Sequence, residues 1–195
     1  PDLFRAIELG GTLPFVRVAQ SSSKDCKQAL DAGAAGIILP MINSADSLQT
    51  AIHSCCWPPA GNRGVGYSRA NLFGRHFNNY NKEAQAPFVL AQIENIKAVN
   101  NLNDILQVPG LDGIIIGPYD LSASMGITGQ FEKLDFINTL KKIKNISAKH
   151  NIPCGYHIVF PELELLKQKI DEGYLLLGYV TDGIFLNTFG KNPIK

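Results

Sequence analysis

The sequence has little net charge: 18 lysine and arginine residues are balanced by 17 aspartate and glutamate residues, which leaves +1 over 195 residues. This balance argues against a nucleic-acid binder and against attachment to an anionic membrane surface. Long apolar runs are also missing, because none approaches the roughly 18 residues that a membrane-spanning helix needs. The chain does not open like a secretory signal peptide. We therefore expect neither a nucleic-acid partner nor a membrane segment.

Cysteine is scarce and is not arranged for metal binding. The four cysteines, Cys26, Cys55, Cys56 and Cys154, form no Cys-x-x-Cys pair, and two of them are adjacent in the chain. This spacing argues against a zinc knuckle and against a disulfide framework. Reduced thiols are typical of a reducing compartment, so the sequence predicts a cytoplasmic protein.

Six short apolar segments predict buried β-strands, with helical patterns between them. Their apolar residues run continuously instead of alternating with polar ones, which is typical of a parallel sheet covered on both faces. The predicted strands are residues 14–19, 35–40, 87–93, 111–117, 152–159 and 174–180, and the predicted helices are 1–11, 23–32, 44–54, 132–151 and 162–172. No linker or low-complexity stretch divides the chain, so residues 1–195 are predicted to form a single domain.

The number of strands, set against the chain length, predicts the fold class. Six strand–helix units in 195 residues take roughly 32 residues each, whereas a complete (β/α)₈ barrel has about 250 residues. We therefore expect an α/β chain folded as a (β/α)₈ TIM barrel that lacks its first two βα units. The alternative is a complete, open, doubly wound sheet of six strands.

Two carboxylates follow neighbouring predicted strands. Gln92 and Glu94 are two residues apart at the end of strand 87–93 and therefore share one side of it, and Asp120 follows strand 111–117. The carboxyl ends of parallel strands are where α/β folds place their sites. Two carboxylates there suit Mg²⁺ or Mn²⁺, which completes its coordination with water and substrate oxygens. The alternative for each acid is a helix cap or a loop charge.

Three further features are candidates for function. Arg17 lies within an apolar strand, so we expect a buried guanidinium facing a carboxylate or a bound anion, with a structural salt bridge as the alternative. His157 lies near the carboxyl end of its strand and is either a site residue or a core histidine. Residues 58–71 form a long segment rich in Gly, Pro and Arg, which is typical of a lid or binding loop.

Five ordered motifs together resemble the HpcH/HpaI family of metal-dependent pyruvate aldolases. They are Phe15–Val18, Ala34–Met41, Pro58–Gly66, Gln92–Glu94 and Gly117–Ser122. Members of this family cleave 4-hydroxy-2-oxo acids and 2-keto-3-deoxy sugar acids to pyruvate and an aldehyde. The family fold is a (β/α)₈ barrel, so the resemblance favours the barrel over the open sheet.

The resemblance implies a role for each matching residue. Glu94 and Asp120 would bind the divalent metal, Mg²⁺ first, with Mn²⁺ and Co²⁺ as alternatives. Arg17 would act in catalysis by holding the keto or enolate oxygen. Gln92 would line the substrate site beside the metal.

The same resemblance implies how the remainder of the substrate is bound. Backbone amides in the turn Gly117, Pro118, Tyr119 and Asp120 would hold the pyruvate carboxylate, and Tyr119 stands where the family often has alanine. His157 would lie near the aldehyde end, at a position that is often aliphatic in the family. The partner is thus expected to be a small-molecule 2-oxo acid.

The resemblance also leaves alternatives open. The family's first two strands and a Gly-Glu-His segment for acid/base work would precede Pro1, and the final barrel helix is expected to be short, ending within residues 187–195. A homo-oligomer is expected. The alternatives for function are a carbon–carbon lyase of the citrate-lyase or malyl-CoA-lyase type, and a truncated, non-catalytic relative that binds a keto acid.

Overall fold

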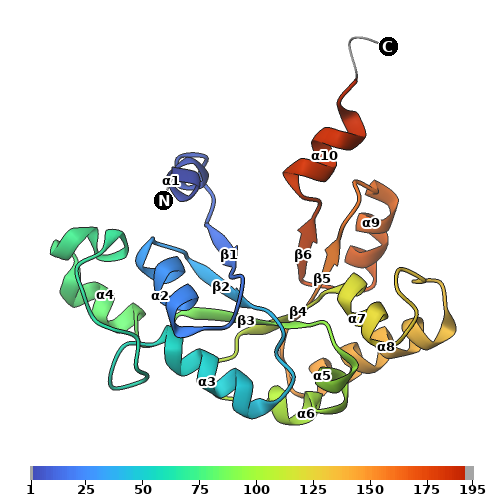
Figure 1. The fold of residues 1–195 in the computed structure, drawn as a ribbon, viewed down its shortest axis with the longest axis horizontal. Helices are drawn as coiled ribbons and strands as arrows, with labels where there is room; N and C mark the ends of the chain where they lie inside the picture. The colour runs from blue at the N-terminus through green and yellow to red at the C-terminus, as the bar shows by residue number, and fades with distance from the viewer. Residues whose placement is uncertain (1, 192–195) are drawn as a thin grey trace.

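A computed structural model describes residues 2–191; residue 1 and residues 192–195 lie outside the described part. Six parallel strands form one sheet in the order of the sequence (Figure 1). They are β1 Phe15–Arg17, β2 Gly36–Leu39, β3 Phe88–Ile93, β4 Gly113–Ile116, β5 Cys154–Ile158 and β6 Leu176–Tyr179. All six predicted strands are therefore confirmed, each somewhat shorter than its apolar segment.

The helices fall between the strands, as βα units require. They are α1 Asp2–Leu9, α2 Ser23–Asp31, α3 Ala45–Cys55, the 3₁₀ helix η1 Arg69–Gly74, α4 Phe77–Glu83, α5 Ile96–Asn100, α6 Leu102–Ile105, α7 Pro118–Ser124, α8 Leu134–Lys149, α9 Leu163–Asp171 and α10 Asp182–Phe189. Serine side chains cap α2 and α3: Ser22 accepts from the Asp25 amide, and Ser44 and Ser47 form a reciprocal capping box. No helix in the described range combines the length and the apolar character needed to cross a membrane.

The strand order decides between the two predicted architectures. A doubly wound sheet reverses its strand order and carries helices on both faces. Here the order is sequential, and Figure 1 shows α3, α5, α6 and α8 along one side of a curled sheet while α1 and α10 project from its two ends. The chain is thus a curled, six-stranded half-barrel, as expected of a TIM-like barrel without two of its units, and the open doubly wound sheet was wrong.

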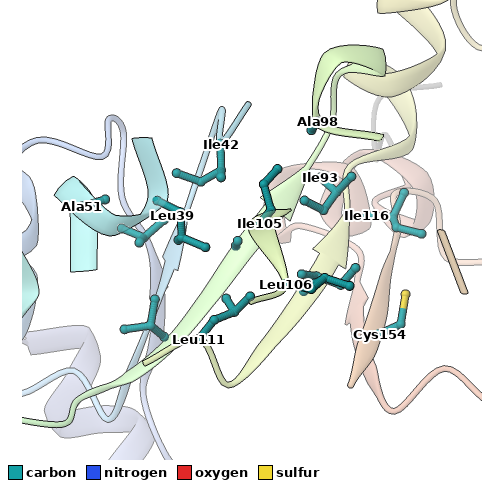
Figure 2. Close-up of a cluster of buried hydrophobic side chains, with 14 of the residues drawn as sticks. Leu39, Ile42, Ala51, Ile93, Ala98, Ile105, Leu106, Leu111, Ile116 and Cys154 are labelled. Carbon is teal, nitrogen blue, oxygen red and sulfur yellow. The ribbon is translucent and has the colours of Figure 1, made fainter. Parts of the chain in front are cut away.

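The strand register shows which residues share a face. Ile37 pairs with Val89, and Leu39 with Ala91, so these side chains lie in common rows on the convex, helix-covered side. Every residue of these rows is fully buried, and helix residues complete the layer. Figure 2 shows part of it, with Leu39, Ile93 and Ile116 of the strands beside Ile105 and Leu106 of the α6 segment.

The other face of the sheet is only partly covered. Leu90 and Ile115 on the central strands are 2% and 7% exposed, whereas Phe15 and Phe88 toward the β1 edge are 39% and 42% exposed. The prediction of a sheet covered on both faces was therefore wrong for the concave face. The physical reason is the open curl: β1 and β6 each pair with one strand only, so no strand faces them across the concave side.

The segment 58–71 does not lie over the carboxyl ends of the strands. It connects α3 to the η1–α4 region ahead of β3, which places it at the amino ends of the strands. Arg63, whose side chain is fully buried, pairs with Asp31 at 3.1 Å and donates to the Tyr80 hydroxyl at 3.1 Å, and Lys27 donates to the Gly64 carbonyl at 2.7 Å. The segment is thus fixed against α2 and α4, so it is not a lid over the carboxyl ends of the strands; its prediction as a binding loop stays a prediction.

The last helix is short and ends where the sequence predicted. α10 covers Asp182–Phe189, so its end lies within residues 187–195, of which residues 192–195 lie outside the described part. No residue of α10 is buried, and Phe185, Leu186 and Phe189 are half exposed or more.

Candidate active site

Glu94 is a buried carboxylate at the carboxyl end of β3. Its side chain is 4% exposed, and its Oε1 accepts a hydrogen bond from the backbone N–H of Met41 at 2.7 Å. Met41 follows β2 and has a positive φ of 56°, an uncommon conformation for a residue other than glycine. The loop after β2 therefore orients the carboxylate that follows β3.

Asp120 and Arg17 act electrostatically on Glu94. Burial is the largest cause that raises the pKa of Glu94, and the negative charge of the neighbouring Asp120 adds to it. The Met41 amide and the positive charge of Arg17 oppose the rise. The structure therefore brings together the two acids and the arginine that the sequence predicted, at the ends of three different strands.

Gln92 and Glu94 both lie against Gly117. A methyl group at position 117 would lie 2.7 Å from Gln92 Nε2 and 3.1 Å from Glu94 Oε2, so only glycine leaves room for these side chains. Gln92 Oε1 is buried and has no hydrogen-bond partner in the described part of the chain. Because a buried polar atom is seldom left unpaired, this oxygen points to a donor or a cation that binds here.

The Gly117–Asp120 turn is the start of a helix. Gly117 caps α7 and donates its N–H to the Ile93 carbonyl at 3.2 Å, and Pro118 has no N–H. Only the N–H groups of Tyr119 and Asp120 therefore remain for a substrate, since the first amides of a helix have no acceptor within it. The sequence predicted that backbone amides throughout residues 117–120 bind the substrate carboxylate, and the structure leaves two of these amides free for that role.

Two side chains border this turn. Tyr119 is 38% exposed and packs edge-on against Phe131, with ring centroids 5.0 Å apart. His157 is half-buried on β5, next to Gly178 of β6, and its pKa is lowered by burial and then by the positive charge of Arg17. Neutral imidazole is thus the favoured form of His157, and Arg17 lies near enough to influence both His157 and Glu94.

Arg17 is not buried, which corrects the sequence prediction. Its side chain is exposed on the edge strand β1, and its guanidinium donates to the Val18 carbonyl at 3.2 Å. None of the ion pairs among residues 2–191 involves it. An arginine in an apolar strand can remain solvated when that strand lies at the open edge of the sheet, so Arg17 keeps its charge available to a ligand.

The donor set fits a hard divalent cation. Residues 2–191 contain no group of three or more His, Cys, Asp and Glu side chains that could hold a metal ion. Mg²⁺, however, takes one or two protein carboxylates and completes an octahedron with water or substrate oxygens. Glu94 and Asp120 supply such a pair, and Gln92 Oε1 is an unpaired oxygen beside them.

The sequence did not reveal the role of Met41. A backbone N–H is present at every position other than proline, so its aim at Glu94 carries no signature in the residue type. A contact of Ser124 was also missed: its hydroxyl accepts from the Ile96 amide at 2.9 Å, which joins α7 to the start of α5. Only the place of Met41 at the end of the motif Ala34–Met41 could have drawn attention to it.

Known proteins resemble this chain over nearly all of its length. Hydroxypyruvate/pyruvate aldolase of Roseobacter denitrificans is 43% identical over 195 residues, which cover 98% of this chain and 75% of that protein. A 4-hydroxy-2-oxo-heptane-1,7-dioate aldolase of Salmonella heidelberg is 43% identical over 118 residues, which are 60% of this chain and 45% of the relative. This second match thus spans less than half of the relative's length.

A solved structure and a family profile agree with these relatives. A HpcH/HpaI aldolase/citrate lyase family protein from Burkholderia cenocepacia J2315 superposes with a TM-score of 0.87 at 29% identity, over 94% of this chain and 74% of that one. The profile of HpcH/HpaI aldolase/citrate lyase matches residues 2–186. With the half-barrel and its paired acids described above, these matches show that the chain belongs to the HpcH/HpaI aldolase/citrate lyase family.

Proposed function

We propose that the protein is a divalent-metal-dependent aldolase that cleaves a 4-hydroxy-2-oxo acid or a 2-keto-3-deoxy sugar acid to pyruvate and an aldehyde. One observation carries the proposal: the buried Glu94 lies beside Asp120, and the charge of Arg17 acts on Glu94 from the same concave side of the sheet. The aldolase relatives support the same chemistry. Glu94 and Asp120 would hold the cation, with Mg²⁺ favoured over Mn²⁺ and Co²⁺.

The roles of the other residues follow from their positions. A divalent cation would supply Lewis acidity toward the carboxylate and ketone oxygens of the substrate. The N–H groups of Tyr119 and Asp120 would bind the substrate carboxylate. The side chain of Gln92 on β3 would help to orient that carboxylate. When the C3–C4 bond breaks, the 4-hydroxyl proton would pass to a water molecule in the site, C4–O would become the aldehyde carbonyl, and the electron pair of the bond would remain on the pyruvate carbon. Arg17 would stabilise the negative charge that develops on the 2-oxo oxygen. His157 would contact the aldehyde product as a neutral ring.

A lysine Schiff base is not favoured. The six strands of the described sheet contain no lysine, and Lys82 and Lys97 lie on helices α4 and α5. Neither of these helices has a lysine among its buried residues. Polarisation of the ketone by a cation and Arg17 is therefore better supported than covalent catalysis.

The test is pyruvate release by the intact protein. We expect turnover of a 4-hydroxy-2-oxo acid with Mg²⁺, Mn²⁺ or Co²⁺, loss of turnover with a chelator, and loss in Glu94→Gln and Asp120→Asn. Glu83→Gln, on an exposed acid of α4, is the matched control and should keep wild-type activity. Turnover that survives chelation or either site substitution would refute the assignment.

The family description also names citrate lyase, so a second lyase reaction is an alternative. A citrate-lyase or malyl-CoA-lyase type of enzyme would use the same metal pair with a larger acyl substrate. Release of glyoxylate or acetyl-CoA in place of pyruvate distinguishes this reaction. Calorimetry with Mg²⁺ and oxalate, run beside the cleavage assay, tests for a non-catalytic binder. Such a protein would bind Mg²⁺ and oxalate and would cleave none of the substrates.

A homo-oligomer is also proposed. The exposed apolar residues of α10 and the unpaired edges of β1 and β6 support it, since exposed apolar surface and open edges favour association. Light scattering of the eluted protein should give a multiple of the chain mass. Phe185→Ser combined with Leu186→Ser should lower that multiple, and a monomeric wild type would contradict the proposal.

A further inference from the structure

A second cavity lies on the convex side of the sheet, away from the acid pair. It has a volume of about 610 Å³ and is enclosed by α8, α9, the loop before α8, and Tyr156 and Tyr174 at the strands. Tyr156 and His157 are adjacent on β5 and therefore point to opposite faces. The cavity and the candidate active site are thus separated by the sheet.

The cavity has more positive than negative charge among its lining residues. Lys169 is 7% exposed, and its ammonium binds both carboxylate oxygens of Glu172 at 3.2 and 2.9 Å, so this buried pair is neutral overall. Lys144 forms no ion pair with a carboxylate of residues 2–191: its ammonium donates to the Glu172 backbone carbonyl and lies 5.0 Å from the centre of the Tyr174 ring. Lys141 adds a further positive charge and Glu132 a negative one, both on exposed residues.

Two donors in the cavity are unused. An ammonium group has three N–H bonds, and the Glu172 carbonyl occupies one of those on Lys144. The hydroxyl of Tyr174, a residue 4% exposed, is buried and has no hydrogen-bond partner. A buried hydroxyl without a partner is unfavourable unless an acceptor binds there, and an anionic acceptor would also use the free N–H bonds of the half-buried Lys144 ammonium.

Most of the remaining lining is apolar, apart from Gln168, whose amide donates to the Glu172 carboxylate at 2.7 Å. Phe131, Phe136, Ile137, Leu140 and Leu165 form the wall of the cavity. The rings of Phe131 and Phe136 lie with centroids 5.2 Å apart, so part of this wall is aromatic. A ligand that fits therefore has a small anionic end and an apolar, flat end.

We propose that this cavity is a second binding site, for a small aromatic carboxylate. The carboxylate accepts from Lys144 and from the Tyr174 hydroxyl, and the ring lies against the Phe131–Phe136 wall. A carboxylate suits the two donors because it offers two oxygens to two separate groups. The proposal is independent of the aldolase reaction, since none of the residues that line the cavity belongs to the acid pair or to the turn beside it.

Phenylacetate and phenylacetamide are the probes, because they share their shape and differ in charge. Titration by calorimetry should show phenylacetate binding with one site per chain, and phenylacetamide binding at least about tenfold more weakly, as expected for the loss of a charge-assisted hydrogen bond. Lys144→Met should weaken phenylacetate binding by about tenfold or more and leave phenylacetamide binding unchanged. Lys144→Arg should restore most of the affinity.

Matched controls keep the result interpretable. Lys142→Met removes an exposed lysine of the same helix that does not line the cavity, and Glu94→Gln alters the active site; both should bind phenylacetate as the wild type does. Phenylacetate should also raise the melting temperature of the wild type and not that of Lys144→Met. Equal affinity for the two probes, equal binding by Lys144→Met and Lys142→Met, or loss of binding in Glu94→Gln would overturn the proposal.

Discussion

The two faces of the sheet use alternate residues of the same six strands, yet they differ in almost every physical property. On β3, Ala91 and Ile93 are fully buried under helices, whereas Gln92 between them and Glu94 after them carry polar atoms to the concave side. Residues that point outward on this strand therefore contribute to stability, and residues that point inward contribute the site. A one-residue shift of register would exchange the two sets.

The difference extends to how polar groups are treated. The convex layer of strand residues is apolar and dry, and its stability comes from packing. The concave side carries the exposed Arg17, the carboxylate of Glu94, and the amide oxygen of Gln92. Burial raises the pKa of Glu94, and the Gln92 oxygen has no hydrogen-bond partner among the described residues. Such groups reduce the stability of a free protein and become favourable when a ligand binds, which is typical of a functional face.

The largest expected effect separates activity from stability on the concave face. Arg17→Ala should lower kcat by about 10² to 10³-fold, because it removes a charge that stabilises developing negative charge. Stability should change by no more than about 0.5 kcal/mol, since the side chain is exposed. Arg75→Ala, which replaces an exposed arginine directly after η1, is the control. A wild-type kcat in Arg17→Ala would contradict the view that the concave face serves activity and the convex face serves stability.

Neighbouring isoleucines of β2 test the convex face. Ile37 is fully buried, whereas Ile38 points to the concave side and is only partly buried. Ile37→Ala should lower the free energy of unfolding by about 2–5 kcal/mol, and Ile38→Ala by roughly half as much. Urea denaturation of both variants measures the difference. Equal losses would mean that the concave face is as well packed as the convex one.

Gly117 tests the close approach between the helix α7 and the site. Gly117→Ala places a methyl group 2.7 Å from Gln92 Nε2, so Gln92 must move away from its position. We expect a loss of about tenfold in kcat/KM, because small displacements of positioning groups reduce turnover. In the control Gly66→Ala, the added methyl group meets no atom within 4 Å and should leave activity unchanged.

The smallest expected effect is the pH dependence of stability at Glu94. Because the folded-state pKa is raised, the unfolded chain ionises first as pH rises, and stability falls between the ordinary glutamate pKa and the raised one. Glu94→Gln should abolish this fall, and Asp120→Asn should reduce it by removing a neighbouring charge. Melting temperatures across the acidic range, without divalent cations, measure it. Saturating Mg²⁺ should reverse the fall in the wild type, because a cation then replaces the proton.

The strands were predictable because apolar segments of six to eight residues are distinct in this sequence. The faces were not, since Ile37 and Ile38 are the same residue type and only the sheet shows which of them lies under a helix. The short helices α4 to α7 were missed for a related reason. α5 and α6 have five and four residues, too few for a helical period to stand out, and α7 begins inside a motif that was interpreted as a turn.

The candidate site was predictable where spacing decided it. Gln92 and Glu94 share a side of β3 because side chains alternate along a strand, and Asp120 follows the next strand. The exposure of Arg17 was not predictable, because it depends on β1 being an edge of the described sheet. Segment 58–71 was misjudged because length and composition give no information about which end of the strands a loop occupies.

The hydrogen bond from Met41 to Glu94 has a consequence for ion selectivity. One oxygen of the carboxylate already accepts a hydrogen bond from a backbone amide, so an ion that binds both oxygens of this side chain would compete with that amide for Oε1. Calcium commonly binds both oxygens of a glutamate and accepts high coordination numbers with irregular geometry. Mg²⁺ is smaller and binds one carboxylate oxygen within a regular octahedron. A strained residue on the neighbouring loop would in this way discriminate against calcium without ever touching the metal.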